Sequence, residues 1–76
     1  MKTHKAYQWL IANTTVEPGH DVEIIPDRQV PEVWLVIDYT LKMSFIVYLK
    51  ENDFEEAEGE DFEDVVRRYS RRWHNG

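Results

Sequence analysis

The sequence predicts a small α+β domain with a three- or four-stranded, mainly antiparallel sheet and a C-terminal amphipathic helix packed on one face. Three observations predict it. Apolar and polar residues alternate from Val33 to Leu49, a Pro18-Gly19 turn precedes a short β-type segment, and apolar residues recur every three or four positions from Phe62 onwards. Seventy-six residues are enough for one modest core, so residues 1–76 are expected to form a single domain.

The central alternation predicts a β-hairpin. Every odd position from 33 to 49 is apolar, whereas the even positions are apolar at both ends of the stretch and polar in its middle. A period of two is typical of a strand, and 17 residues exceed the usual strand length of about five or six. Two strands joined by a turn therefore fit better than the alternative, one long bent strand.

The same alternation predicts a register for this hairpin. Keeping all odd positions on one face requires an odd number of loop residues, which gives the loop Thr40-Leu41-Lys42. This loop lacks the Gly or Asn that three-residue hairpin loops favour. The predicted pairs are Tyr39 with Met43, Ile37 with Phe45, Leu35 with Val47, Val33 with Leu49, Trp34 with Tyr48 and Glu32 with Lys50.

The N-terminal segment from Thr3 to Asn13 fits a helix or a strand. Thr3 could cap a helix, and Ala6, Tyr7, Leu10 and Ile11 would form its apolar stripe. Tyr7, Trp9 and Ile11 also alternate as in a strand, and helix is slightly favoured.

The next segment contains a turn and a strand. Pro18-Gly19 predicts a type II turn, because proline presets φ at the second position and glycine accepts a positive φ at the third. Val22 to Ile25 should then form a short strand ended by Pro26, and residues 27–31 a loop.

The C-terminal part divides into an acidic segment and a helix. Residues 51–59 suggest a solvated connection with Phe54 as its anchor to the core, and a helix should begin near Glu60 or Asp61. Acid-before-base pairs four residues apart, Glu63 with Arg67 and Asp64 with Arg68, support this helix. Its apolar stripe comprises Phe62, Val65, Val66, Tyr69 and Trp73.

One helix cannot cover both faces of the predicted sheet. In the predicted register Trp34, Val36, Ile46 and Tyr48 share the second face, so the N-terminal segment or a partner must cover them. A homodimer formed through these four side chains is one such arrangement.

The composition of the chain argues against several classes of function. The net charge is −6, which argues against a general nucleic-acid-binding protein unless the few basic residues are gathered on one face. The chain has no cysteine, which excludes disulfides and thiolate zinc sites, and the sequence has neither a signal-peptide pattern nor an apolar run long enough to span a membrane. A soluble, cytoplasmic protein is expected.

Nine acids and no base lie between Glu51 and Asp64. Such a run can be a solvated segment, a cation site or a surface that docks on a basic partner, and its spacing does not match a calcium-binding loop. For docking, the candidate partner-binding residues are Asp53, Glu55, Glu56, Glu58, Glu60 and Asp61, with the aromatic Trp34 and Tyr48. The competing hypothesis is a nucleic-acid-binding helix that uses Arg67, Arg68, Arg71 and Arg72.

No catalytic or metal-binding pattern emerges. His4, His20 and His74 are far apart, and neither Ser44 nor Ser70 comes with a recognisable His and Asp. We therefore expect no enzymatic activity, cofactor, metal or small-molecule substrate. The sequence favours a small inhibitor or accessory factor that docks on the basic surface of a larger protein, such as one that handles nucleic acid.

Overall fold

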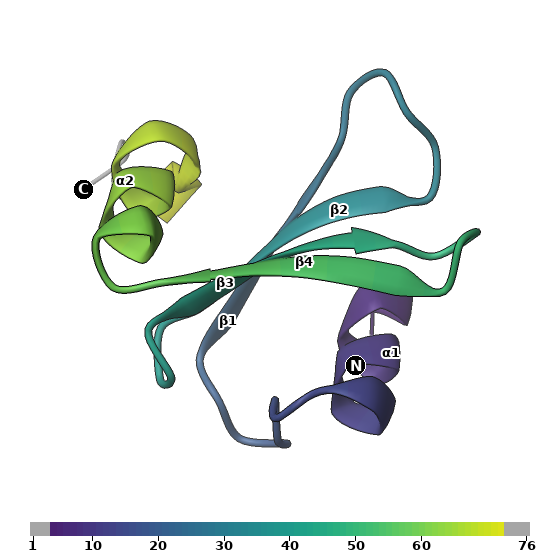
Figure 1. Ribbon diagram of the computed structural model, residues 1–76, viewed down its shortest axis with the longest axis horizontal. Coiled ribbons are helices and arrows are strands. Elements are labelled where there is room, and N and C mark those ends of the chain that lie inside the picture. Colours follow the sequence, from purple (N-terminus) through teal and green to yellow (C-terminus); the bar gives the residue numbers. More distant parts are fainter. Residues whose placement is uncertain (1–3, 73–76) are drawn as a thin grey trace.

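The computed structural model describes residues 4–72 and shows a four-stranded antiparallel sheet between two helices (Figure 1). The strands lie in the order β1-β2-β3-β4, and the helices lie on opposite sides of the sheet. This arrangement confirms the predicted α+β class. The elements are α1 (Lys5–Asn13), β1 (Val22–Pro26), β2 (Val33–Asp38), β3 (Met43–Tyr48), β4 (Asp53–Glu58) and α2 (Glu60–Tyr69).

The sheet is a meander in which the last three strands begin at regular intervals along the sequence. Strands β2, β3 and β4 have six residues each and begin ten positions apart, at residues 33, 43 and 53. The residue before each of these strands is in the left-handed region, with φ of 63° at Glu32, 58° at Lys42 and 55° at Asn52. The β2–β3 and β3–β4 turns therefore both have four residues and end in the same backbone conformation.

The predicted hairpin is present, but its predicted register is wrong by one residue. Val36 lies opposite Phe45 and Ile37 opposite Ser44, while Trp34 pairs with Val47 instead of Tyr48. Neither Glu32 nor Lys50 belongs to a strand, so their predicted pairing is also wrong.

The cause is the four-residue turn of residues 39–42. The Asp38 carboxylate accepts hydrogen bonds from the backbone N–H groups of Thr40 (2.9 Å) and Leu41 (3.0 Å). Lys42 then takes the left-handed conformation that closes the turn. An even number of turn residues places even positions of β2 on the same face as odd positions of β3.

The main core lies on the face of the sheet that α1 covers, hereafter the α1 face. The N-terminal segment is a helix, in which Ala6 and Leu10 are fully buried. They belong to one cluster with Val36, Phe45 and Val47. The α1 helix is capped by the Nδ1 atom of His4, which accepts from the Ala6 N–H at 3.1 Å. The predicted cap, Thr3, lies outside the described residues.

The turn before β1 and the loop after it match the prediction. The His20 N–H donates to the Glu17 carbonyl at 3.2 Å, and Gly19 between them has φ of 100°, as a type II turn requires. Strand β1 ends at Pro26 and forms one edge of the sheet.

The acidic segment is the clearest departure from the sequence prediction. Instead of a solvated connection, residues 53–58 form β4, which pairs with β3 at the second edge of the sheet. The predicted anchor is confirmed, because Phe54 lies on the α1 face with its ring 5.9 Å from Phe45 and 5.5 Å from Trp9.

Helix α2 lies on the opposite face of the sheet, hereafter the α2 face. It starts at Glu60, as predicted, and ends at Tyr69, while Trp73 lies outside the described residues. Phe62 is 8% exposed, and its ring lies 6.4 Å from that of Tyr39. The predicted Asp64–Arg68 ion pair is present at 3.2 Å. Among residues 4–72, no ion pair joins Glu63 to Arg67.

The observed register also divides the predicted apolar patch. Trp34 and Val36 lie on the α1 face under the N-terminal helix, whereas Ile46 and Tyr48 lie on the α2 face. The four side chains therefore do not form one dimerisation surface. Helix α2 leaves part of the α2 face of the sheet uncovered.

Candidate interaction surface

The candidate partner-binding carboxylates line one edge of the sheet and continue into the next helix. Four of the six residues of β4 are acidic, and two further acids open α2. All six carboxylate residues are exposed. We call them the acidic edge: Asp53, Glu55, Glu56, Glu58, Glu60 and Asp61.

Strand geometry separates the carboxylates of β4 into two rows. Glu55 pairs with Ile46 and therefore projects on the α2 face, as Asp53 does, whereas Glu56 pairs with Phe45 and projects with Glu58 on the α1 side. A six-residue strand is about 20 Å long, so four carboxylates give about one charge per 5 Å. One strand of DNA carries about one charge per 3.4 Å along its axis.

Within the described residues, the carboxylates of the acidic edge are not paired with basic side chains. Among residues 4–72, no ion pair links any of its six carboxylates to a lysine or arginine. Glu60 and Asp61 lie in the first turn of α2, where the helix dipole stabilises negative charge. The six carboxylates are therefore fixed on regular structure, and no basic side chain of residues 4–72 neutralises their charge through an ion pair.

The two predicted aromatic residues are separated by the sheet. The Tyr48 hydroxyl donates to Glu55 Oε2 at 2.6 Å, so Tyr48 adjoins the acidic edge. This hydrogen bond, with burial and the charges of nearby carboxylates, raises the pKa of Tyr48. Trp34 is on the α1 face, with its ring 5.2 Å from that of His4, and does not join Tyr48.

The four candidate arginines have different environments. Arg72 donates to Asp21 at 2.7 Å and to the Val22 carbonyl at 3.3 Å, and its guanidinium carbon lies 4.9 Å from the centre of the Tyr39 ring. Arg68 pairs with Asp64 within α2. Of these four arginines, Arg67 and Arg71 have side chains without an ion pair within the described part of the chain.

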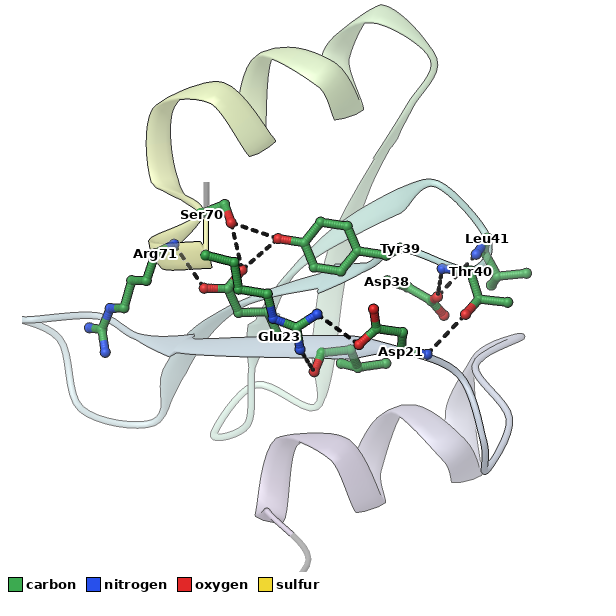
Figure 2. Close-up of polar contacts among 10 residues, drawn as sticks. Asp21, Glu23, Asp38, Tyr39, Thr40, Leu41, Ser70 and Arg71 are labelled. Atoms are coloured by element: carbon green, nitrogen blue, oxygen red, sulfur yellow. Dashed lines mark hydrogen bonds and ion pairs between the residues drawn. The ribbon is translucent and has the colours of Figure 1, made fainter. Parts of the chain in front are cut away.

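A polar cluster that sequence reasoning missed fastens the end of α2 to β1 (Figure 2). Glu23 accepts hydrogen bonds from the Tyr39 hydroxyl (2.6 Å), the Ser70 hydroxyl (2.8 Å) and the Arg71 backbone N–H (2.9 Å). We call this cluster, with the neighbouring Arg72–Asp21 ion pair, the C-terminal clamp. The only sequence signal for it is an isolated acid among the apolar residues of β1.

The clamp shifts the pKa of two of its members. Burial acts to raise the pKa of Glu23, but the hydrogen bonds from Tyr39, Arg71 and Ser70, with the positive charge of Arg72, outweigh it and leave the pKa below its ordinary value. Burial, followed by the hydrogen bond to Glu23, raises the pKa of Tyr39. Because of these shifts, the contribution of the clamp to stability is expected to depend on pH.

A polar pair of Asp38 and His20 also has a structural role. Asp38 is fully buried, and its Oδ2 lies 2.8 Å from Nδ1 of His20. The second ring nitrogen of His20 is 4.0 Å from the Glu17 carboxylate, where a catalytic dyad would need a nucleophile. The pair holds the segment before β1 against the end of β2.

Comparison with protein-family models, curated proteins and solved structures found no match to this chain. Within residues 4–72, no helix is long and apolar enough to cross a membrane, and no three acidic or histidine side chains are grouped as metal ligands.

Proposed function

We propose that the protein is a non-enzymatic, acidic protein-interaction module whose acidic edge docks on the basic surface of a larger protein. The observation that carries this proposal is the acidic edge itself, six exposed carboxylates without a basic partner in residues 4–72. A protein that handles nucleic acid is a suitable partner, because its basic groove already accepts closely spaced negative charges and releases counterions when they bind.

The carboxylates of β4 project from a strand, and this favours a docking role for them over the role of keeping the chain solvated. Strand β4 is hydrogen-bonded to β3, and Phe54 packs between Phe45 and Trp9. The carboxylates therefore project from a fixed backbone, and binding orders fewer residues than it would in a flexible acidic tail. In this proposal the protein acts as an inhibitor or accessory factor.

The nucleic-acid alternative has less support. Arg72 is engaged with Asp21 and Arg68 with Asp64, so any phosphate would compete with a carboxylate for both. The net charge of −6 also opposes the approach of a polyanion.

The test compares the wild type with a variant that carries Glu55→Gln, Glu56→Gln, Glu58→Gln and Glu60→Gln. Proteins captured from lysate at low salt are identified, and their affinities are then measured across a salt series. The acidic-edge variant should lose the basic partner and part of the salt dependence of binding, while its thermal unfolding stays close to that of the wild type.

A matched control separates the position of the charges from their sum. A variant with Gln8→Lys, Ala12→Lys, Thr15→Lys and Glu17→Gln also has a net charge of −2, because each set changes the charge of −6 by +4. These four residues are exposed on α1 and the segment after it. The control should keep the partner. Equal binding by both variants, or retention of the wild type on immobilised DNA or RNA near physiological salt, would contradict the proposal.

A further inference from the structure

Helix α2 covers only one end of its face of the sheet. It begins directly after β4, and the residue that follows it, Ser70, is bonded to Glu23 of β1, so the helix crosses all four strands. Six-residue strands are about 20 Å long, whereas a helix with its side chains is about 10 Å wide. A second helix of the same width would therefore fit beside α2.

The open end of the α2 face is an apolar groove of about 730 Å³. Ile25, Leu35 and Ile46 are aligned across β1, β2 and β3, and Glu55 ends this row on β4. Ile46 is 38% exposed although it lies in the centre of the sheet.

One wall of the groove is a second face of α2. Val65, Arg68 and Tyr69 line it at spacings of three and four residues, which is the side of a helix that packs against a neighbouring helix. Tyr69 is 53% exposed there. The opposite wall is the loop after β1, which includes Arg28.

The groove has opposite charges at its two ends. Arg28 and Arg71 lie at the β1 end, and their side chains have no carboxylate partner within residues 4–72. Asp27 lies beside them, but its carboxylate already accepts hydrogen bonds from the backbone N–H groups of Gln29 and Val30. Glu55 lies at the β4 end. The β1 end of the groove is therefore suited to bind carboxylates.

We propose that this groove binds an amphipathic helix of a partner protein, with its apolar face on Ile25, Leu35 and Ile46 and its carboxylates beside Arg28 and Arg71. Helix α2 shows that the length fits: ten residues span about 15 Å, and four strands span about 14 Å. A second copy of the chain cannot supply such a helix without unfolding, since α1 and α2 are each packed on their own sheet. The proposed occupant is therefore a helix of a different protein. The groove adjoins the acidic edge, because Glu55 and Glu56 of β4 belong to its lining.

A random peptide library tests the proposal and requires no identified partner. Displayed peptides of about 16 residues, long enough for four helical turns, are selected on the immobilised 76-residue chain. The enriched sequences should have apolar residues at spacings of three and four with Asp or Glu towards one end. Synthetic versions should become helical on binding, as measured by circular dichroism.

Groove variants then locate the binding site. Ile46→Lys should weaken peptide binding by about tenfold or more, because it removes apolar contact in the centre of the groove. The double variant Arg28→Glu and Arg71→Glu should do the same by replacing attraction with repulsion. Its control is Lys42→Glu with Arg67→Glu, which makes the same change of net charge at exposed residues outside the groove lining and should leave binding within about twofold.

Three results of these experiments would overturn the inference: no peptide is enriched, the enriched peptides still bind the Ile46→Lys variant, or the enriched peptides are basic. Light scattering that shows a wild-type dimer converted to monomer by Ile46→Lys would mean that a second copy occupies the groove. Thermal unfolding of each variant distinguishes loss of binding from loss of fold.

Discussion

Replacing Asp38 with alanine should destabilise the protein severely. Its carboxylate is fully buried and has three polar contacts: the backbone N–H groups of Thr40 and Leu41, and Nδ1 of His20. Alanine removes all three contacts at once and leaves two backbone donors of the β2–β3 turn without their acceptor. It also removes the side chain that specifies a four-residue turn.

The magnitude follows from these contacts. A hydrogen bond contributes about 0.5–1.5 kcal/mol net, and more when the acceptor is charged, so three bonds to a buried carboxylate amount to about 3–5 kcal/mol. A chain of this length is expected to have a total stability of about 4–11 kcal/mol, from about 0.05–0.15 kcal/mol per residue. Asp38→Ala should therefore remove a large fraction of the free energy of unfolding.

Urea denaturation followed by circular dichroism measures this change, and the chain offers a matched control. Asp27 also accepts from two backbone N–H groups, at 2.8 and 2.7 Å, but it is exposed. Asp27→Ala should therefore cost about 0.5–1 kcal/mol. Asp38→Asn, which keeps an oxygen for the turn, should fall between the two. If Asp38→Ala is within about 1 kcal/mol of the wild type, this account of the turn is wrong.

Three further predictions concern the core and the C-terminal clamp. Phe45→Ala should lower the free energy of unfolding by about 3–5 kcal/mol in urea, because Phe45 is fully buried in the main cluster. The lowered pKa of Glu23 means that its contribution to stability is present above the ordinary glutamate pKa of about 4.3 and is lost as the pH falls through the folded-state value. Urea midpoints measured from pH 2 to 6 should therefore fall less steeply on acidification in Glu23→Gln. The raised pKa of Tyr39 has the opposite sign: its contribution is present below about pH 10 and is lost as the pH rises through the folded-state value. Absorbance titration of tyrosinate should show two late-titrating groups, Tyr39 and Tyr48, and Tyr39→Phe should remove one of them.

Element types could be predicted from the sequence wherever periodicity was strong. The alternation of β2 and β3 and the apolar spacing of α2 each identified an element correctly. The register could not be predicted, because unbroken alternation implies a turn with an odd number of residues. Asp38 and Lys42 instead stabilise a turn with an even number, four. Strand β4 was concealed because four of its six residues are acidic and its two apolar residues, Phe54 and Ala57, do not alternate with them. Asn52 was nevertheless a signal for a left-handed residue before a strand.

The candidate site was predictable to a similar extent. The carboxylates of the acidic edge could be identified from sequence, but their alignment on an edge strand depends on pairing with β3. The clamp could not be predicted, because it joins Glu23 to Ser70 across 47 positions without any local pattern. The open groove depends on where α2 crosses the sheet, which is fixed by that same tertiary contact.

The ten-residue pitch of the meander also bears on how the chain folds. Residues paired between β2 and β3 are 5 to 15 positions apart, from Asp38–Met43 to Val33–Tyr48, and the β3–β4 pairs have the same range. Closing such short loops costs little entropy, and sheets built from local pairings fold faster than those that depend on distant ones. The bond from Trp9 to Asn52 spans 43 positions, and the clamp spans more. The three strands β2, β3 and β4 should therefore assemble first. The two helices should dock afterwards, so substitutions in the clamp should accelerate unfolding while leaving the folding rate almost unchanged.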